Sequence, residues 1–132
     1  MEAEPVNQSE WSRVFDVCGL LRRTTDGLAL KDDKEWLRYV LREAASGMQS
    51  SVMWAAETES SGPGGTGETS KLARYVVAAD AARSDAVVAL YCLDFMRSEH
   101  LIDEELAKRV DEQLTDVEGA LRSLAHRLRG DG

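Results

Sequence analysis

Residues that form most catalytic and metal sites are scarce in this sequence. Histidine and cysteine each occur only twice in 132 residues, at His100, His126, Cys18 and Cys92. The histidines have no ExxH spacing, which disfavours a di-iron or other metal site. The cysteines have no CxxC spacing and lie in apolar helical patterns, so we expect buried thiols in a reducing compartment. The sequence therefore predicts no metal, no cofactor and no catalytic residue, and we do not expect an enzyme.

Positive charge and long apolar runs are also lacking. The 16 lysines and arginines are outnumbered by 24 aspartates and glutamates, and the formal net charge is −8. Proteins that bind nucleic acid usually present a basic surface, so this charge disfavours RNA contact. No apolar run approaches the ~18 residues that a membrane span needs. The start of the sequence, MEAEPVNQSE, is acidic and polar, unlike a secretory signal. We expect a cytoplasmic protein that does not enter a membrane.

The period-two alternation and β-branched enrichment that mark strands are missing as well. Apolar residues instead recur at spacings of three and four in four segments, from Ser9 to about Arg23, from Asp32 to about residue 57, over 71–96, and from Asp103 to about residue 128. We predict one all-α domain over 1–132, an antiparallel up-and-down four-helix bundle. Residues 1–8 are predicted as a disordered tail, and the Gly/Ser-rich stretch 58–69 as a flexible loop.

The predicted loop contains the stretch GPGGTGET, which has the spacing of a phosphate-binding loop. Such loops need a lysine that reaches the β- and γ-phosphates, and Glu68 stands in its place. A strand should also precede the loop, and the pattern predicts none. We therefore interpret the stretch as a solvated linker.

The segment 71–96 carries more apolar residues than one face of a helix can hold. It has no glycine or proline, which predicts one long helix. On a helical wheel, a first apolar arc consists of Leu72, Tyr75, Val76, Ala79, Ala82, Ala86, Leu90 and Leu93. A second arc, on the far side, consists of Val77, Ala81, Val88, Cys92 and Phe95. A surface helix of a small domain needs only one apolar stripe, so we predict that the second arc is an oligomer interface.

Four charged residues lie near the first arc, namely Asp80, Arg83, Asp94 and Arg97. A spacing of three residues predicts that Asp80 pairs with Arg83, and Asp94 with Arg97. Two interpretations of these pairs stay open. They form a partly solvated strip of salt bridges, or they lie at the interface and fix the register between subunits.

Three stretches of the chain resemble a known bacterial family. They are REAASGMQSSV, KLARYVVAADAARSDAVVAL and HLIDEELAKRVDEQLTDVEGALRSL. Over 41–124 the chain is similar to the four-helix bundle proteins encoded in intervening sequences of large-subunit ribosomal RNA genes, and to their relatives, the accessory variability (Avd) proteins of diversity-generating retroelements. The resemblance implies a homo-oligomer, typically a pentamer, without known catalysis. In the retroelement branch it also implies binding to a reverse transcriptase and its RNA.

The chain departs from this family at two positions and in its charge. Gln49 stands where family members often carry a proline. Ser51 stands where family members carry an asparagine, near that proline. The retroelement relatives are basic, whereas this chain is acidic.

Two hypotheses about function follow from these patterns. The first is a non-enzymatic, homo-oligomeric helical bundle that acts as a scaffold or accessory protein for a partner protein. The alternative is a nucleic-acid-binding accessory factor of a reverse transcriptase. For this alternative, the predicted contacts are the arginines Arg22, Arg23, Arg122, Arg127 and Arg129.

Overall fold

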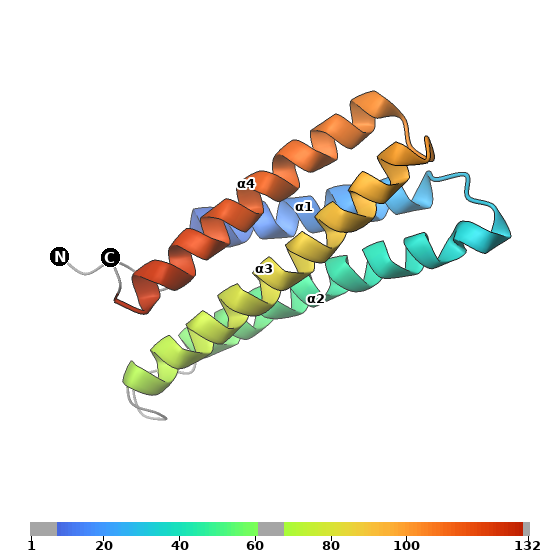
Figure 1. Ribbon diagram of the computed structural model, residues 1–132. Coiled ribbons are helices and arrows are strands. Elements are labelled where there is room, and N and C mark those ends of the chain that lie inside the picture. The colour runs from blue at the N-terminus through green and yellow to red at the C-terminus, as the bar shows by residue number, and fades with distance from the viewer. Residues whose placement is uncertain (1–7, 61–67, 131–132) are drawn as a thin grey trace.

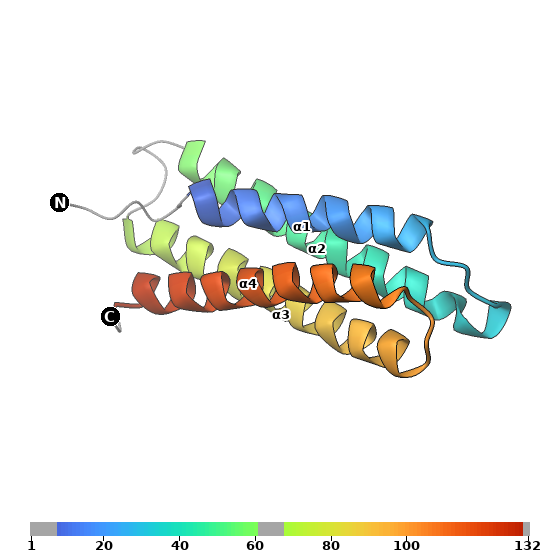
Figure 2. The same cartoon turned by 90° about the horizontal axis from the view of Figure 1, so that it is seen from above.

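Four long helices make up almost all of the structure. The computed structural model describes residues 8–60 and 68–130. The helices are α1 (Gln8–Asp26), α2 (Glu35–Ser60), α3 (Glu68–Ser98) and α4 (Glu104–Leu128), with a short 3-10 helix, η1 (Asp32–Lys34), before α2. No strand occurs in these two ranges. Successive helices run in opposite directions, each packs on the next, and α4 returns to α1 (Figures 1 and 2). The predicted all-α, antiparallel four-helix bundle is confirmed.

The first helix is longer than predicted, since it continues past Arg23 to Asp26. Two threonines that follow the predicted end of the helix are buried within its last turn. The hydroxyl of Thr24 donates to the carbonyl oxygen of Leu20 at 2.7 Å, and that of Thr25 donates to the carbonyl of Arg22 at 2.9 Å. Each polar group is therefore satisfied by the preceding turn of its own helix, which allows it to be buried.

The predicted loop over 58–69 is also shorter than expected, because α2 runs to Ser60 and α3 begins at Glu68. Thr58 is buried, and its hydroxyl donates to the carbonyl oxygen of Trp54 at 2.9 Å. The rest of the predicted loop, 61–67, and residues 1–7 of the predicted tail lie outside the described residues.

Helix α3 turns a row of alanines toward the core. Five of them are fully buried, namely Ala78, Ala79, Ala82, Ala86 and Ala89. Larger buried side chains stand on either side of this row, with Tyr75 before it and Met96 after it. Because alanine adds little width to a helix, α2 and α4 can approach the middle of α3 closely.

The other helices fill the core with larger side chains. The leucine and valine stripe predicted for α4 is buried at Val110, Leu114, Val117, Leu121 and Leu124. In α1, by contrast, Phe15 fits the apolar spacing of three and four but is 56% exposed. Val17 takes the inward position and is fully buried. Phe15 lies four residues after Trp11, so its side chain can stand at the edge of the buried side of the helix or on the exposed side next to it. The spacing alone did not distinguish these two positions.

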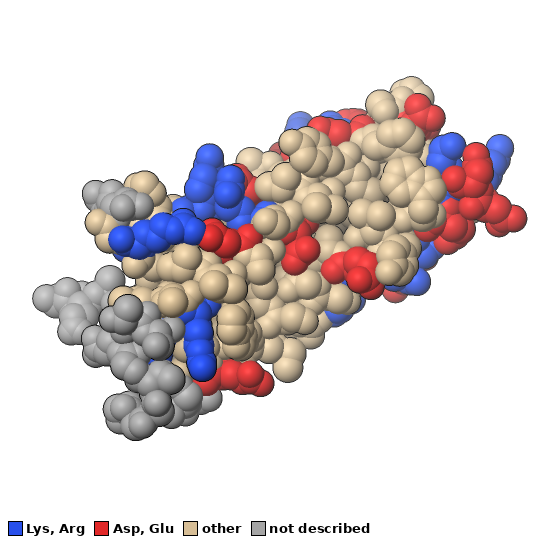
Figure 3. Space-filling model, turned by 60° about the horizontal axis from the view of Figure 1, so that its bottom comes forward, with Lys and Arg blue, Asp and Glu red and all other residues tan. Residues whose placement is uncertain are grey.

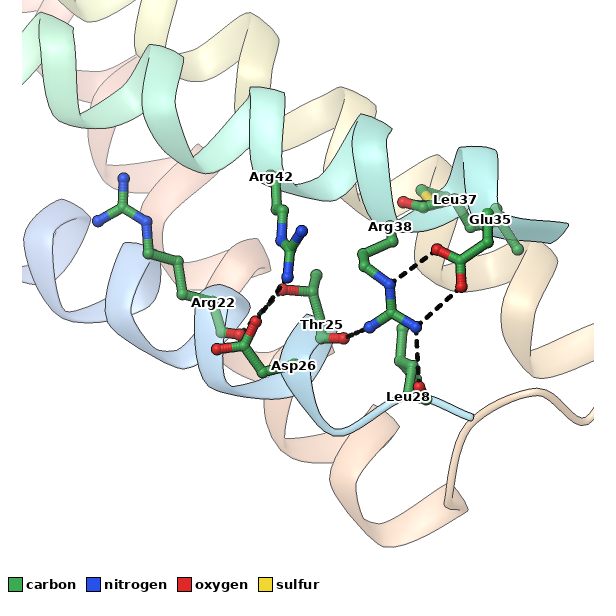
Figure 4. A network of polar contacts seen from close by, with 9 residues as sticks. Arg22, Thr25, Asp26, Leu28, Glu35, Leu37, Arg38 and Arg42 are labelled. Atoms are coloured by element: carbon green, nitrogen blue, oxygen red, sulfur yellow. Dashed lines mark hydrogen bonds and ion pairs between the residues drawn. The ribbon is translucent and has the colours of Figure 1, made fainter. Parts of the chain in front are cut away.

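A guanidinium group closes the connection between α1 and α2. Arg38 of α2 donates to the carbonyl oxygen of Thr25 and, at 3.0 Å, to that of Leu28 (Figure 4). Its Nε also donates to Glu35 at 3.0 Å. Carbonyl groups at the end of a helix have no partner within the helix, and here Arg38 supplies one. Arg42 adds an ion pair with Asp26 at 2.8 Å. These contacts fix the angle at which α2 leaves α1.

The turn between α3 and α4 is held by a Schellman motif. The amide of Leu101 donates to the carbonyl of Met96 at 2.8 Å, and the amide of His100 donates to that of Arg97 at 3.2 Å. This geometry places His100 in the left-handed region, with φ of 56°. Asp103, where the last apolar segment was predicted to begin, caps α4 by accepting from the amide of Leu106 at 3.2 Å.

The left-handed conformation leads to a prediction for His100→Gly. Glycine adopts positive φ without the steric cost that a Cβ imposes, although its unfolded state has more entropy to lose. We expect the free energy of unfolding to rise by about 0.5–1 kcal/mol, measured by urea denaturation. His100→Ala keeps the Cβ and is the matched control, for which no gain is expected. A loss of stability in the glycine variant would show that the imidazole contributes more than the backbone strain costs.

Candidate interaction surface

Two exposed rows of residues run side by side along α2 and α3, on the side away from the core. We call this surface the α2–α3 face. Within each row the residues recur at alternating spacings of three and four, so each row lies along one side of its helix. The row on α2 is Trp36, Tyr39, Glu43, Ser46, Ser50 and Met53, and the row on α3 is Val77, Ala81, Ser84, Val88, Tyr91 and Phe95.

The α2–α3 face exposes large apolar side chains. On α3, Val77 is 50% exposed, Val88 45% and Tyr91 72%. The two rows meet where the rings of Trp36 and Phe95 approach with centroids 5.7 Å apart. Figure 3 shows this side of the bundle as a broad surface of uncharged residues with a few carboxylates within it and basic side chains toward its ends. Contiguous exposed apolar surface of this kind marks sites of interaction in soluble proteins.

Most of the predicted second arc lies on this face, but Cys92 does not. Val77, Ala81, Val88 and Phe95 are exposed to solvent. Cys92 is buried, and its thiol lies 3.9 Å from the carbonyl oxygen of Leu37 on α2. Burial raises the pKa of this thiol to about 11. The assignment of Cys92 to an outer surface was therefore wrong, because the arc was drawn too wide and reached the side of α3 that faces α2.

Two members of the α3 row were missed from the sequence, namely Ser84 and Tyr91. Ser84 was left out because only apolar residues were used to draw the arcs. Their spacing gives a usable signal, because the steps from Val77 to Phe95 alternate regularly between four and three only when both are included.

The predicted ion pairs within α3 do not form. Arg83 pairs instead with Glu118 of α4 at 2.8 Å. Arg97 also turns to α4 and pairs with two of its carboxylates. These are Glu104 at 2.5 Å and Asp111 at 3.0 Å.

The two aspartates complete the correction. Asp80 pairs with Arg129, which follows α4, and Asp94 is exposed and has no ion pair within 8–60 and 68–130. A spacing of three permits a pair within one helix, but it gives no information about carboxylates on a neighbouring helix. Three of the four charged residues therefore connect α3 to α4 or to the residue that follows it, within one chain.

The five arginines predicted to contact nucleic acid do not form one basic surface. Three of them have carboxylate partners: Arg127 pairs with Glu10 at 2.9 Å, Arg122 with Glu118 at 3.6 Å, and Arg129 with Asp80. These three lie toward the end of α4, where α1 begins (Figure 1). Arg22 and Arg23 lie near the other end of α1. The set is therefore divided between the two ends of the bundle and is partly neutralised.

A carboxylate on α3 rests directly against the backbone of α2. A Cβ added to Gly47 would lie 2.8 Å from Cγ of Asp85, so the carboxylate occupies the space that any other residue at position 47 would fill. Glycine in the middle of a helix costs about 1 kcal/mol relative to alanine. Loss of solvent raises the pKa of Asp85 above its ordinary value. Within the described part of the chain, the Asp85 carboxylate has neither a hydrogen bond nor an ion pair.

Asp85 lies in a groove between α2 and α3 that has a volume of about 500 Å³. The groove is lined by Tyr39, Val40, Glu43, Ala44, Ser46, Gly47, Ser50, Asp85 and Val88. Its two charged groups, Glu43 and Asp85, are both acidic, and its hydroxyl groups come from Tyr39 and two serines. Chemically the groove suits a cation or a strong hydrogen-bond donor with an apolar stem.

A second groove, of about 420 Å³, lies between α1 and α4. Its lining contains acidic and basic side chains and the exposed ring of Phe15. The lining residues are Phe15, Asp16, Gly19, Leu20, Arg23, Arg109 and Gln113. The α2–α3 groove differs because its charge is of one sign and it continues into the apolar rows on either side.

The described residues contain no cluster of three or more histidine, cysteine, aspartate or glutamate side chains that could hold a metal ion. Among the helices that the structure describes, none combines the length and apolar character needed to cross a membrane. Comparisons of the chain with protein-family models, curated proteins and solved structures found no match. The geometry of the α2–α3 face is therefore the main basis for a functional proposal.

The desolvated carboxylate predicts an unusual pH dependence for Asp85→Asn. A raised pKa in the folded state means that the charged form opposes folding, so stability falls as pH rises above the ordinary range of an aspartate. At neutral pH the asparagine variant should therefore be more stable than the natural chain, and the gain should shrink as pH falls toward about 4. Urea denaturation of dilute protein, followed by tryptophan fluorescence, measures this difference.

Glu43→Gln removes an exposed carboxylate from the same groove and is the matched control. If Asp85→Asn destabilises the dilute protein at neutral pH, the carboxylate has a stabilising role inside the chain and the desolvation account is wrong.

Proposed function

We propose that this protein is a non-enzymatic, homo-oligomeric helical bundle that acts in the cytoplasm as a scaffold or accessory protein for a partner protein. The single observation that carries the proposal is the α2–α3 face. Burial of apolar surface stabilises an association by about 25 cal/mol per Å², and this face offers apolar side chains along the α3 row and toward both ends of the α2 row. Association through it would remove them from water.

The spacing of the α3 row supports packing of helix against helix. Alternating steps of three and four residues are the pattern of a coiled-coil seam, in which side chains of one helix fit between those of another. Ala81 and Ser84 in the middle of the row are small enough for close approach, while Val77 and Val88 on either side can interlock with a second helix. The residues of this row are uncharged, which favours burial of the seam.

The resemblance to intervening-sequence and Avd proteins supports the same kind of assembly. On that analogy, the expected oligomer is a pentamer, and the partner could be a reverse transcriptase. The alternative, a nucleic-acid-binding factor, receives less support because three of its five arginines pair with carboxylates of the same chain. It predicts RNA affinity that falls steeply with salt concentration.

Val88→Asp tests the proposal. Val88 is 45% exposed in the single chain, so the substitution should leave the helical content unchanged. In the oligomer it would bury an unpaired charge, at a cost of roughly 3 kcal/mol or more, which weakens association about 100-fold. Light scattering and native mass measurement report the assembly, and circular dichroism reports the helices.

The control is Phe15→Asp, which places the same charge at an exposed apolar residue of α1, away from the α2–α3 face. This variant should assemble like the natural chain. A natural chain that is monomeric at micromolar concentration, or assembly that is lost only in Phe15→Asp, would contradict the proposal.

A further inference from the structure

The lining of the α2–α3 groove holds two carboxylates and no basic side chain. Asp85 is partly buried against Gly47, and within the described ranges nothing pairs with its carboxylate. Glu43 adds a second acidic group to the lining. The charged form of a partly desolvated carboxylate is stabilised when a cation donates hydrogen bonds to it. A guanidinium does so most effectively, because it can donate two parallel hydrogen bonds. The groove therefore lacks the group that would complete it.

The same face carries an arginine that forms no ion pair with any other residue the structure describes. Arg74 is exposed, and it stands three residues before Val77 and seven before Ala81, so it continues the α3 row toward the start of the helix. The other arginines of α3, Arg83 and Arg97, both pair with α4. Arg74 forms no ion pair within the described part of the chain.

Arg74 and Asp85 cannot meet within one molecule. They stand eleven positions apart on one continuous helix, which separates them by about 16 Å at 1.5 Å per residue. An arginine side chain extends about 6–7 Å, less than half of this distance. Any contact between the two groups must therefore join two copies of the chain.

We propose that the α2–α3 groove of one copy binds the Arg74 side chain of a second copy, with Asp85 and Glu43 as its acceptors. This inference rests on the proposed homo-oligomer and names the contact that sets its register. The stem of Arg74 would lie along Val88 and Tyr39, and its guanidinium would face the two carboxylates. A two-fold pair of chains makes the contact twice, and a ring makes it once at each interface.

The proposed contact with Arg74 also explains why the chain keeps two features that lower the stability of the single molecule. Gly47 lowers the helix propensity of α2, and Asp85 loses solvent without gaining a partner among the residues that the structure describes. Features that weaken a fold locally are typical of sites used for binding. In the oligomer the same carboxylate would accept charge-assisted hydrogen bonds from Arg74.

A double-mutant cycle tests the contact. Sedimentation equilibrium gives the dissociation constants of the natural chain, Arg74→Gln, Asp85→Asn and the double variant. Each single substitution should raise the dissociation constant about tenfold or more, because it leaves one partner of the pair without the other. The double variant should be no weaker than the single variants, since the contact is lost only once.

Arg109→Gln is the matched control, because Arg109 is an exposed arginine of α4 that lies in the other groove. It should leave the dissociation constant unchanged. Circular dichroism of each variant checks that the bundle is folded.

Failure of this inference differs from failure of the proposed function. If the natural chain assembles and Val88→Asp dissociates it, while Arg74→Gln and Asp85→Asn do not weaken assembly, the contact is wrong and the oligomer stands. Effects of the two substitutions that simply add in the double variant would also overturn the contact. A monomeric natural chain would overturn both.

Discussion

Close packing of α3 against its two neighbours is the constraint on which the rest of the structure depends. Its inward face is a row of fully buried alanines, so the core at this level is filled by side chains from the other helices. Leucines and valines of α4 and residues such as Leu41 and Met48 of α2 supply that volume. The larger apolar side chains in the middle of α3, including Val77 and Val88, have no space inside and lie outside. The exposed α3 row therefore follows from the small side chains on the buried side of the same helix.

The charged residues of α3 are also distributed unequally between its side next to α4 and its side next to α2. Its paired ions, Asp80, Arg83 and Arg97, all turn toward α4 or the residue that follows it. Arg83 and Arg97 pair with carboxylates of α4, and Asp80 pairs with the residue that follows it, so ion pairs join α3 to α4 and its end along much of their length. The side of α3 that adjoins α2 carries Asp85 in place of such pairs. One helix therefore presents an alanine side to the core, a charged side to α4 and, over 77–95, an uncharged row to solvent.

Features that repeat along one helix could be predicted from the sequence. The stripe of α4 and its start at Asp103 depend on residues within a few turns of each other, and both were placed correctly. Features that depend on which helices become neighbours could not be placed in the same way. Arg83 and Arg97 have suitable partners at short range, and nothing in their spacing reveals the better-placed carboxylates on α4. Gly47 and Asp85 are separated by a long stretch of chain, so their contact leaves no local pattern.

The contact between Gly47 and Asp85 has a consequence for how the sequence can change over time. A side chain at position 47 would meet the carboxylate, so the Asp85 side chain would have to shift to admit it. The two positions are therefore coupled, because a substitution at one changes the space open to the other. Among descendants of this chain, glycine at position 47 should be retained more often where position 85 keeps its acid, so the two positions form a linked pair of characters.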